Sequence, residues 1–584
     1  MADLLQQQYS SVFSNPENVS LNIDSKNKKS PEMCDIDITN QDIMEAINSF
    51  STNSAAGPDG LPAIILKKCV NSISYPLKLF WDNCLELGIT PLTLKTSYIT
   101  PIFKGGDQGE PSNYRPVALT SHLTKTFEKI IRKKIVDHME TNNLFNDSQH
   151  GFRSGRSCLS QLLTHFDTIL SYLENEKNID TVYLDFSKAF DKVDHNILLA
   201  KLRRYGINEK VIKWIKSFIT GRIQFVTVNN ILSEFSKVIS GVPQGSVLGP
   251  LLFLIMISDI DDDISYSILS SFADDTRIIK EVTEIMDTFK LQYDLNQIYE
   301  WTRRNNMKLN GCKFEHLSYG RNIDAKSYSI YLDNKHSKIE TKTSVKDLGV
   351  IMTHDGKFDE HINAVVDKVN SLVSWILRTF ESREKNTMLT LWKSLVIPHL
   401  DYCSQLWSPL KRGQQQKLEL LQKNFLKKIA GSYPLTYWQQ LSKFNMYSLE
   451  RRRERYIIMY VWKILEKQVP NFSHLQNGCE IGGIKSYFNN RLGRKCIVPM
   501  VKRGPFQQIR CASLTVMGPR LFNCLPKEIR NISNCSKNHF KKKLDLFLRR
   551  IRDEPQIPNY VQYSQTTSNS IKDMMNIGLI KLDV

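Results

Sequence analysis

The chain has 584 residues, of which 41% are apolar and 24% are charged, a composition that is ordinary for a soluble globular protein with several cores. Lysine and arginine number 78 against 60 aspartate and glutamate residues, so the formal net charge is +18. A field of this sign favours polyanionic partners, either nucleic acid or an anionic membrane surface, although a basic protein without such partners is an equal alternative.

A secreted or membrane-spanning protein is not expected. The opening residues, MADLLQQQYSSVF, lack the basic segment and apolar core of a signal peptide. The longest apolar run, Leu251–Ile257, is far shorter than the roughly 20 residues that span a bilayer, so we expect a buried strand or helix there. The eleven cysteines include no C-x-x-C pair and no zinc-finger spacing, which predicts free thiols in a reducing compartment. We expect an intracellular protein of the nucleus and/or cytoplasm.

In chain order, the first 50 residues are polar, with a linker expected around Ser25–Pro31, and helical periodicity follows through Trp81–Leu87. From about residue 95 to residue 355, short β-rich runs alternate with helical ones, which predicts an α+β fold. The predicted strands include Tyr98–Phe103, Thr181–Phe186, Gln224–Val228 and Ile268–Ala273.

Beyond residue 356 the pattern becomes helical, with amphipathic helices predicted over Phe358–Phe380, Asn386–Ile397 and Lys411–Ile429. The remainder is more basic, and Arg451–Arg455 is interpreted as phosphate-facing or solvated, with a nuclear import patch as a further alternative. A loose tail is expected from Pro555. The patterns divide the chain into an N-terminal linker and helical extension (1–94), an α+β core (95–355), a helical segment (356–440) and a basic C-terminal region (441–584).

Two acidic positions carry the first hint of chemistry. The β-rich run Val182–Phe186 ends at Asp185 before a segment predicted to be helical, which places this acid at the mouth of a strand. On its own, such an acid is most often a helix N-cap. The apolar run Ser271–Thr276 is broken by Asp274 and Asp275, which predicts a tight hairpin with acids at its tip, whereas an ordinary solvated turn is the alternative.

The two strands together indicate a metal site if they lie side by side. Two carboxylates about 4 Å apart repel by roughly 4 kcal/mol at an effective dielectric constant near 20, so a cation must neutralise them. Oxygen ligands without cysteine or histidine favour Mg²⁺, or Mn²⁺, and two such ions activate an attacking 3′-hydroxyl and stabilise leaving pyrophosphate. Because side chains alternate along a strand, we assign Asp274 as the direct ligand and Asp275 as a close contributor to the site formed with Asp185.

A loop rich in glycine and proline, GVPQGSVLGP, occupies residues 241–250. Its three glycines and two prolines force an irregular backbone that a bulky partner can approach closely. Gln244 is the one long amide of this loop and can donate and accept hydrogen bonds at once.

Seven blocks then occur in one order along the chain: NYRPVALTS (113–121), QHGFRSGRS (149–157), YLDFSKAFDKVDH (183–195), GVPQGSVLGP (241–250), FADDT (272–276), LNGCK (309–313) and LGV (348–350). Together they resemble the reverse transcriptase of non-LTR (LINE-like) retrotransposons, with the jockey-like branch as the nearest likeness. The resemblance is strongest from about residue 95 to residue 355. It implies an RNA-directed DNA polymerase that adds dNTPs to a primer 3′-hydroxyl by two-metal-ion catalysis.

The resemblance also implies a right-hand fold of fingers, palm and thumb, with Asp185, Asp274 and Asp275 as the metal-binding palm carboxylates. Phe190 matches an aromatic gate that excludes the 2′-hydroxyl of a ribonucleotide, and a core phenylalanine on the helix after the strand is the alternative. Lys313 matches a lysine that protonates departing pyrophosphate, against an ordinary surface lysine.

Further matches concern the nucleotide and the template. Arg115 corresponds to a fingers residue that grips the triphosphate, with Lys104 as an assistant and a surface arginine as the alternative. Gln244 is implied to line the nucleotide pocket beside the sugar. Four residues of one block are implied to face the template: Gln149, Gly151, Phe152 and Arg153. The basic helices after residue 356 are implied to form a thumb that contacts phosphates, which makes binding salt-sensitive.

The implied partners are an RNA template, a DNA primer and dNTPs, without a membrane and with no prediction of oligomeric state. These elements usually encode an endonuclease before the polymerase, and the first residues here resemble the linker after it, so we expect this chain to lack that endonuclease.

Three other functions are compatible with parts of the pattern. An RNA-dependent RNA polymerase shares the palm acids, but Phe190 and the VPQG block argue against it. A catalytically inactive or repurposed nucleic-acid-binding remnant is the main alternative, against which the intact Asp185, Asp274, Gln244 and Arg115 argue. A purely structural interaction protein leaves the acids unexplained.

Overall fold

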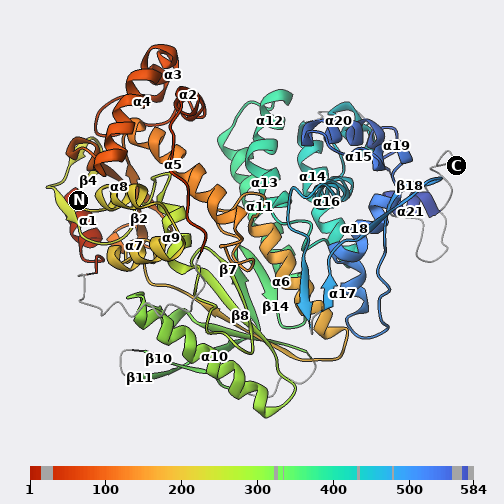
Figure 1. Ribbon diagram of the computed structural model, residues 1–584. Coiled ribbons are helices and arrows are strands. Elements are labelled where there is room, and N and C mark those ends of the chain that lie inside the picture. Colours follow the sequence, from red (N-terminus) through yellow and green to blue (C-terminus); the bar gives the residue numbers. More distant parts are fainter. Residues whose placement is uncertain are drawn as a thin grey trace.

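The protein is described by a computed structural model that covers residues 1–14, 30–320, 326–332, 335–429, 435–476, 479–554 and 569–576. Most of the linker predicted at Ser25–Pro31, and the tail predicted from Pro555 up to residue 568, lie outside the described residues. The described part is a mixture of helices and strands, as the α+β pattern predicted. Figure 1 shows the N-terminal helices and the C-terminal helices on opposite sides of the molecule, with β7 and β8 between them.

The central sheet carries the two acidic segments. Its strand order is β12-β9-β3-β8-β7, and β3 runs antiparallel to both of its neighbours, β8 and β9. The strands are β3 (Ile179–Leu184), β7 (Ile268–Phe272), β8 (Asp275–Glu281), β9 (Glu315–Tyr319) and β12 (Glu340–Lys342), with the short hairpin β10 (Ser329–Leu332) and β11 (Lys335–Lys338) nearby.

Both faces of the central sheet are covered. On one face, Val182, Leu184 and Ile278 pack with α10 (Ile285–Arg304) and the N-terminal helices. On the other, Ile179 and Ile279 pack with α6 (Cys158–Leu173) and with the C-terminal helices. The alternation of side chains along each strand therefore sends successive residues into two different cores.

A second sheet lies in the N-terminal half, where β1 pairs antiparallel with β2 and parallel with β4. Its strands are β1 (Thr96–Phe103), β2 (Tyr114–Leu119), β4 (Arg222–Val228), β5 (Ile231–Leu232) and β6 (Ser236–Val238). The helices of this half are α1 (Ala2–Ser10), α2 (Asn40–Asn48), α3 (Ala63–Lys68), α4 (Val70–Leu87), α5 (His122–Thr141), α7 (His195–Arg204), α8 (Glu209–Ile219) and α9 (Gly249–Ile257), with 3-10 turns η1 (Leu92–Lys95), η2 (Pro111–Asn113) and η3 (Gly311–Lys313).

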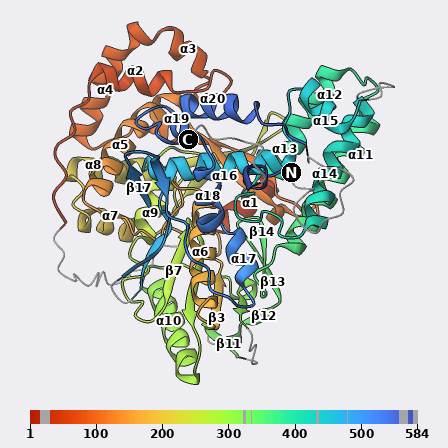
Figure 2. The ribbon, with the colours of Figure 1, turned by 90° about the vertical axis from the view of Figure 1, so that its right-hand side faces the viewer.

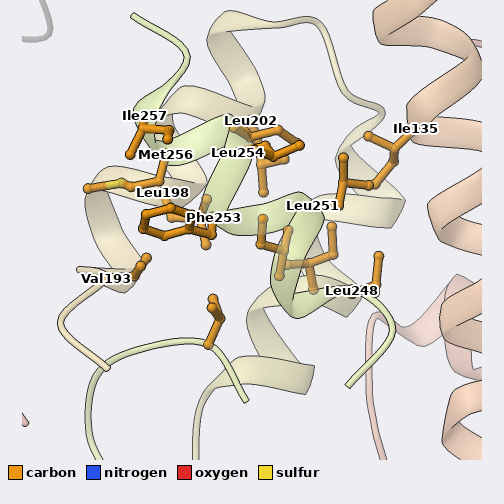
Figure 3. Close-up of a cluster of buried hydrophobic side chains, with 14 of the residues drawn as sticks. Ile135, Val193, Leu198, Leu202, Leu248, Leu251, Phe253, Leu254, Met256 and Ile257 are labelled. Carbon is orange, nitrogen blue, oxygen red and sulfur yellow. The ribbon is translucent and has the colours of Figure 1, made fainter. Parts of the chain in front are cut away.

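The apolar run at Leu251–Ile257 is a buried helix, α9, in the middle of the N-terminal core. Figure 3 shows its side chains against Leu198 and Leu202 of α7 and Ile135 of α5. A helix buried on all sides needs no polar face, which explains why the sequence shows no amphipathic period here. This core anchors the residues that follow the 241–250 loop.

The C-terminal part is mainly helical. Its helices are α11 (Asp359–Thr379), α12 (Lys385–Leu391), the π-helical η4 (Trp392–Val396), α13 (Ile397–Asp401), α14 (Arg412–Ile429), α15 (Tyr437–Lys443), α16 (Leu449–Leu465), α17 (Gln507–Ala512), α18 (Leu514–Asn523), α19 (Lys527–Arg530), α20 (Lys537–Leu548) and α21 (Ile571–Asn576). Three hairpins accompany them: β13 (Ser344–Asp347) with β14 (Val350–Thr353), β15 (Ser473–Gln476) with β16 (Cys479–Gly482), and β17 (Ser486–Asn489) with β18 (Gly493–Cys496).

The four predicted strands and the three predicted amphipathic helices are confirmed, within a few residues at their ends. One local expectation is wrong. The chain does not become helical directly after Asp185, because residues 187–192 form turns and α7 begins only at His195, where the Asp194 side chain caps the amides of Asn196 and Ile197. Asp185 is therefore not an N-cap, and Phe190 lies in a turn.

The interpretation of Arg451–Arg455 as a solvated, phosphate-facing or import patch is also wrong. Arg451, Arg453 and Arg455 are buried on α16, which Figure 2 shows passing between α18 and α20. Arg452 makes a bidentate contact with Asp401, and Arg455 makes one with Asp545. A run of arginines looks solvated in a sequence, but acids from distant segments neutralise it in the fold.

The cysteines agree with the expectation from their spacing. The nine cysteines whose side chains the structure describes are free thiols. Within the described ranges, no helix combines the length and the apolar character that a membrane crossing requires.

The attachment of α9 generates a stability prediction. Glu128 of α5 is fully buried, and its Oε2 atom accepts hydrogen bonds from the amides of Val247 and Leu248, at 2.7 and 2.9 Å. Replacing Glu128 with alanine leaves two buried amides unpaired, so we expect a loss of about 1–3 kcal/mol in the free energy of unfolding. Thermal unfolding followed by circular dichroism measures the loss.

The matched variant is Glu128→Gln, which keeps an oxygen acceptor and removes a carboxyl whose pKa is raised by burial. We expect this variant to unfold close to the parent. Equal losses in the two variants would contradict the hydrogen-bond explanation.

Candidate active site

The two acidic segments meet at one end of the central sheet. In the register of β3 and β8, Leu184 pairs with Thr276, so the next positions along these strands are Asp185 and Asp275. Asp274 and Ala273 form the two-residue turn between β7 and β8, where Phe272 pairs with Asp275. The predicted hairpin with acids at its tip is thus confirmed, and the strand pairing brings it beside Asp185.

Alternation along the strands decides which acid faces the cleft. Asp185 lies on the same face as Tyr183, and Asp275 on the same face as Arg277. All four of these residues, together with Lys313, line a cleft beside the β13–β14 hairpin. Asp274, in the turn, does not line this cleft. The register therefore places Asp275 beside Asp185, and the assignment of Asp274 as the direct ligand stays a prediction.

The carboxylates are held at an electrostatic cost. Burial and the neighbouring charge of Asp275 raise the pKa of Asp274 to about 6, with a smaller contribution from Asp185 and an opposing one from Arg115. Burial and the charge of Asp185 likewise raise the pKa of Asp275, against the lowering effect of Arg277 and Lys313. Asp274 and Asp275 resist ionisation because they are buried and because other carboxylates are near, which is the electrostatic signature of a cation site.

Cations surround these acids. The Lys313 ammonium lies 3.2 Å from Oδ2 of Asp185. Arg115 is exposed on β2 and acts electrostatically on both Asp274 and Asp275. Burial lowers the pKa of Lys104, and the positive charges of Lys188, Arg115 and Lys313 lower it further, so these three cations lie within electrostatic range of Lys104. The arrangement fits a ligand that carries several negative charges.

No group of three or more histidine, cysteine, aspartate or glutamate side chains in the described residues is arranged to hold a metal ion. The three aspartates are therefore not a preformed three-ligand site. Their chemistry still fits a hard divalent cation, because all the donors are carboxylate oxygens and the pKa values of Asp274 and Asp275 are raised by burial and by neighbouring negative charge.

The 241–250 loop packs against both halves of the site. The Gln244 Nε2 donates a 2.7 Å hydrogen bond to Oδ1 of Asp191, and the carbonyl of Gln244 accepts one from the amide of Ala118 at 2.6 Å. Gly245 adopts φ +125°, and a Cβ there would lie 2.4 Å from the Ala118 carbonyl. The loop is thereby fixed to strand β2, three residues from Arg115.

Phe190 is half-buried beside this loop. Its ring stacks on Phe253 of α9 with centroids 4.4 Å apart, and its backbone carbonyl accepts a hydrogen bond from Val242. The ring of Phe152 approaches it edge-on at 6.1 Å. Phe190 thus combines a core contact with a partly open side, and its role as a gate stays a prediction.

Gln149 binds the turn that contains Asp274. Its Oε1 accepts hydrogen bonds from the amides of Ala273 and Gly151, at 2.8 and 2.7 Å, and its Nε2 donates to the Ala273 carbonyl at 3.3 Å. Ala273 has φ +55°, a conformation that favours glycine. Gly151 is also pressed against this turn, because a Cβ there would lie 2.4 Å from the Ala273 amide.

The other two predicted template residues differ from each other. Phe152 is exposed, as a template contact requires. Arg153 has its side chain largely buried and makes a bidentate contact with Glu140, together with a 2.7 Å hydrogen bond to the Asn146 carbonyl. Their predicted contact with a template stays a prediction, and the contacts of Gln149 and Arg153 in the structure are internal.

Three further residues of the site escaped the sequence analysis. Arg277 is buried and forms an ion pair with Asp347 of β13, which ties the acidic hairpin to the β13–β14 hairpin. Tyr402 donates a 2.7 Å hydrogen bond to the carbonyl of Leu348 in the turn of that hairpin. The alternation Asp275–Arg277 was a signal for Arg277, whereas nothing in the sequence indicated Tyr402.

Comparison with known proteins identifies the class. Residues 102–352 match the family model described as reverse transcriptase (RNA-dependent DNA polymerase). This segment contains the central sheet, both acidic segments and the 241–250 loop. The chain therefore carries a reverse transcriptase domain.

Several curated proteins of mobile elements are similar over about two thirds of the chain. A probable RNA-directed DNA polymerase from transposon X-element of Drosophila melanogaster is 26% identical over 404 residues, which are 67% of this chain and 44% of that protein. The RNA-directed DNA polymerase from mobile element jockey of Drosophila funebris is 27% identical over 68% of this chain and 44% of its own length. A probable RNA-directed DNA polymerase from transposon BS of Drosophila melanogaster is 25% identical over 72% and 48%.

These relatives confirm the resemblance to the reverse transcriptases of non-LTR retrotransposons, the jockey-like branch included. The alignments cover less than half of each relative's own length.

The contacts of Gln149 generate a prediction about turnover. Replacing it with alanine removes two hydrogen bonds to Ala273, in the turn before Asp274, and one to Gly151. We therefore expect the acids to be mispositioned and the rate of nucleotide incorporation to fall by about 100-fold. The affinity for a primer–template hybrid should not change, because the contacts of Gln149 are internal. Single-turnover kinetics and fluorescence anisotropy measure the two quantities.

Phe152→Ala provides the contrast, because Phe152 is exposed in the same block. If this block binds template through its exposed ring, Phe152→Ala weakens the hybrid while Gln149→Ala does not. A loss of hybrid affinity in Gln149→Ala without loss of turnover would contradict the positioning role.

The raised pKa of Asp274 generates a second prediction, on stability. The pKa is about 6 in the folded chain against 3.8 for an ordinary aspartate, so ionisation costs stability above about pH 6 and nothing below about pH 4. At about pH 8, Asp274→Asn should therefore unfold at a higher temperature than the parent, with a gain of at most about 3 kcal/mol in the free energy of unfolding. Near pH 4 the two proteins should unfold at the same temperature.

Differential scanning fluorimetry across pH in a chelating buffer measures this effect. Asp137→Asn, at an exposed position of α5, is the matched control. A stabilisation that is equal at both pH values would rule out ionisation of Asp274 as its cause.

Proposed function

We propose that the chain is an RNA-directed DNA polymerase that adds dNTPs to a primer 3′-hydroxyl on an RNA template. One observation carries the proposal. A reverse transcriptase domain brings Asp185 and Asp275 side by side at a cleft, with Asp274 in the adjoining turn and four cations within electrostatic range. Nucleotidyl transfer needs carboxyl groups whose pKa values are raised, and it needs cations opposite them that bind phosphate.

Asp185, Asp274 and Asp275 would bind the divalent metal ions, Mg²⁺ or Mn²⁺. When bound, two such ions would activate the 3′-hydroxyl and neutralise charge that develops on the leaving pyrophosphate. The carboxylates fit this task because the pKa values of Asp274 and Asp275 are raised by the charges around them, which a cation would relieve.

The chain's own cations would orient the nucleotide. Arg115 carries a planar guanidinium that can contact two phosphate oxygens at once, and Lys104 adds a second charge from the neighbouring strand. Lys313, 3.2 Å from Asp185, would give a proton to departing pyrophosphate. Each of these roles requires a side chain that a ligand can reach, and all three side chains are exposed to solvent.

Gln244 and Phe190 would select the sugar. Gln244 is held by hydrogen bonds to Asp191 and to Ala118 of β2. Its loop would therefore form a rigid wall beside Arg115 and Lys104, the residues proposed to bind the triphosphate. Phe190 is supported from behind by Phe253, which prevents its ring from yielding to a 2′-hydroxyl. Because of this support, the proposed gate selects by shape.

In the proposed right-hand arrangement, the central sheet is the palm, the β1–β2 region belongs to the fingers and the helices from α11 onward form the thumb. The chain carries a net charge of +18, and binding to a hybrid would weaken steeply with salt. Free thiols fit a reducing compartment, in the nucleus or the cytoplasm.

The test is primer extension by the purified chain on an RNA template, with dNTPs and Mg²⁺ or Mn²⁺. We expect DNA product from the parent and none from Asp274→Ala, because that variant loses a metal-binding carboxylate. NTPs should not replace dNTPs in the parent. In Phe190→Val, which has a smaller side chain at the gate, the use of NTPs should rise.

Asp137→Asn is again the matched control, since it removes a carboxylate from an exposed helix position, and it should extend primers like the parent. A folded parent that binds the hybrid but makes no product would instead indicate an inactive or repurposed element. Product that forms equally well with NTPs would indicate an RNA polymerase.

A further inference from the structure

A groove on the C-terminal part lies apart from the catalytic cleft. It is formed between the β17–β18 hairpin, the end of α16 and the segment after α19, and its lining includes Lys467, Tyr487, Phe488, Arg494, Asn531 and Asn534. Figure 1 shows β18 at the edge of the molecule that faces away from the N-terminal helices. In Figure 2, which views that edge directly, β17 lies in front. None of the cleft-lining residues at Asp185 contributes to this groove.

The hairpin presents two aromatic rings to solvent. Tyr487 is 47% exposed and Phe488 is 67% exposed, although aromatic side chains of this size are usually buried. They are adjacent on β17, so alternation sends them to opposite faces of the hairpin. The pairing of Tyr487 with Lys495 and of Phe488 with Arg494 puts a cationic residue opposite each aromatic one.

The hairpin itself is held rigidly to the fold. Arg494 donates hydrogen bonds to Glu466 and to the carbonyl of Leu465, at 2.7 and 2.8 Å, and its amide donates to Asn531 at 2.8 Å. Cys496 is buried at the other end of β18, where it exchanges hydrogen bonds with Asn523. The exposed rings therefore project from a fixed support and do not belong to a fraying edge.

The sequence around the hairpin carries charge of one sign. No aspartate or glutamate occurs between Glu480 and Glu528. The same stretch contains nine basic residues, which are Lys485, Arg491, Arg494, Lys495, Lys502, Arg503, Arg510, Arg520 and Lys527. Lys485 and Arg491 are exposed near the two ends of β17.

One acid, Glu466, does line the groove. It lies directly after α16, and its carboxylate already accepts hydrogen bonds from other parts of the protein. Its Oε1 accepts a hydrogen bond from Arg494 and its Oε2 accepts one from the amide of Asn534, both at 2.7 Å. The exposed cations at Lys485 and Arg491 are therefore not opposed by this acid. Fixed aromatic rings beside such cations favour a ligand that has both flat rings and negative charges.

We propose that this groove and hairpin bind single-stranded nucleic acid outside the catalytic cleft, with bases stacked on Tyr487 and Phe488 and phosphates contacted by Lys485, Arg491 and Lys495. Asparagine side chains that line the same groove offer amides for hydrogen bonds with bases or sugars. The inference rests on the proposed function only in taking nucleic acid as the chain's substrate. It adds a second contact for the unpaired part of the template.

The test uses the full chain and primer–template hybrids that are either blunt or extended by a long single-stranded tail of RNA or DNA. Fluorescence anisotropy measures the affinity for each hybrid. We expect the tail to strengthen binding in the parent, and the double variant Tyr487→Ala with Phe488→Ala to lose that gain, by about tenfold or more. Binding and extension of the blunt hybrid should stay at the parent's level in this variant.

Two matched variants complete the test. Tyr75→Ala with Leu79→Ala removes a comparable exposed apolar pair from α4, and it should keep the gain from the tail. Tyr487→Phe with Phe488→Tyr keeps both rings and should also keep it. If the double alanine variant loses the gain in affinity for both RNA and DNA tails, the surface binds either kind of strand. If it loses the gain for RNA tails alone, the surface recognises the 2′-hydroxyl.

An unchanged gain from both tails in the double alanine variant would overturn the proposal, and so would ultraviolet crosslinks from the tail that map outside residues 485–496 and 531–534. A failed polymerase would appear differently, as absent extension on the blunt hybrid. The two failures are therefore distinguishable.

Discussion

The antiparallel pairing of β3 with β8 is the constraint on which the rest of the site depends. It carries two acids from segments far apart in the chain to neighbouring places at the end of one sheet. The arrangement costs electrostatic free energy, because burial and mutual repulsion raise the pKa values of Asp274 and Asp275. Much of the surrounding structure offsets this electrostatic cost. Lys313 contacts Asp185, and Arg277 lies on the same face of β8 as Asp275. The sheet is packed on both faces, which holds the strands together.

The same pairing explains why buried polar groups concentrate near the sheet. The Arg277 side chain projects from β8 on the cleft face and forms an ion pair with Asp347. This ion pair connects β8 to the β13–β14 hairpin. Gln149 reaches the turn from a loop that precedes α6 and satisfies the backbone of Ala273. These contacts contribute little buried apolar area. They fix positions, which is what catalysis by oriented charges requires.

Sequence reasoning predicted the parts of this site that depend on local pattern. The strand at Thr181–Phe186 and the acidic hairpin follow from apolar runs that end at acids, and the buried helix at Leu251–Ile257 follows from an unbroken apolar run. The β3–β8 register could not be predicted, because pairing between distant strands leaves no periodic signal. For the same reason the sequence favoured Asp274 over Asp275, and it did not indicate that Gln149 and Arg153 bind other parts of the protein.

Arg451–Arg455 shows the opposite failure. Five residues with four arginines have the composition of an exposed patch, and only distant acids such as Asp401 and Asp545 reveal that the helix is buried. Charge in a sequence identifies a need for a partner, and it does not say whether that partner is solvent, a phosphate or another side chain. The hairpin at β17–β18 is more informative, because there the cations occur in a stretch without acids and beside exposed rings.

If the chain has the proposed function, the hydrogen bond between the Ala118 amide and the Gln244 carbonyl has a consequence for copying accuracy. Arg115 and Gln244 belong to one mechanical unit, because the strand that carries the arginine is bonded to the loop that carries the amide. A correctly paired nucleotide would meet a frame whose phosphate and sugar contacts are already in register. A mispaired nucleotide would shift the sugar. It could not move the sugar contact with Gln244 without straining the phosphate contact with Arg115. Under the proposed function, such coupling would make this single backbone hydrogen bond a determinant of fidelity.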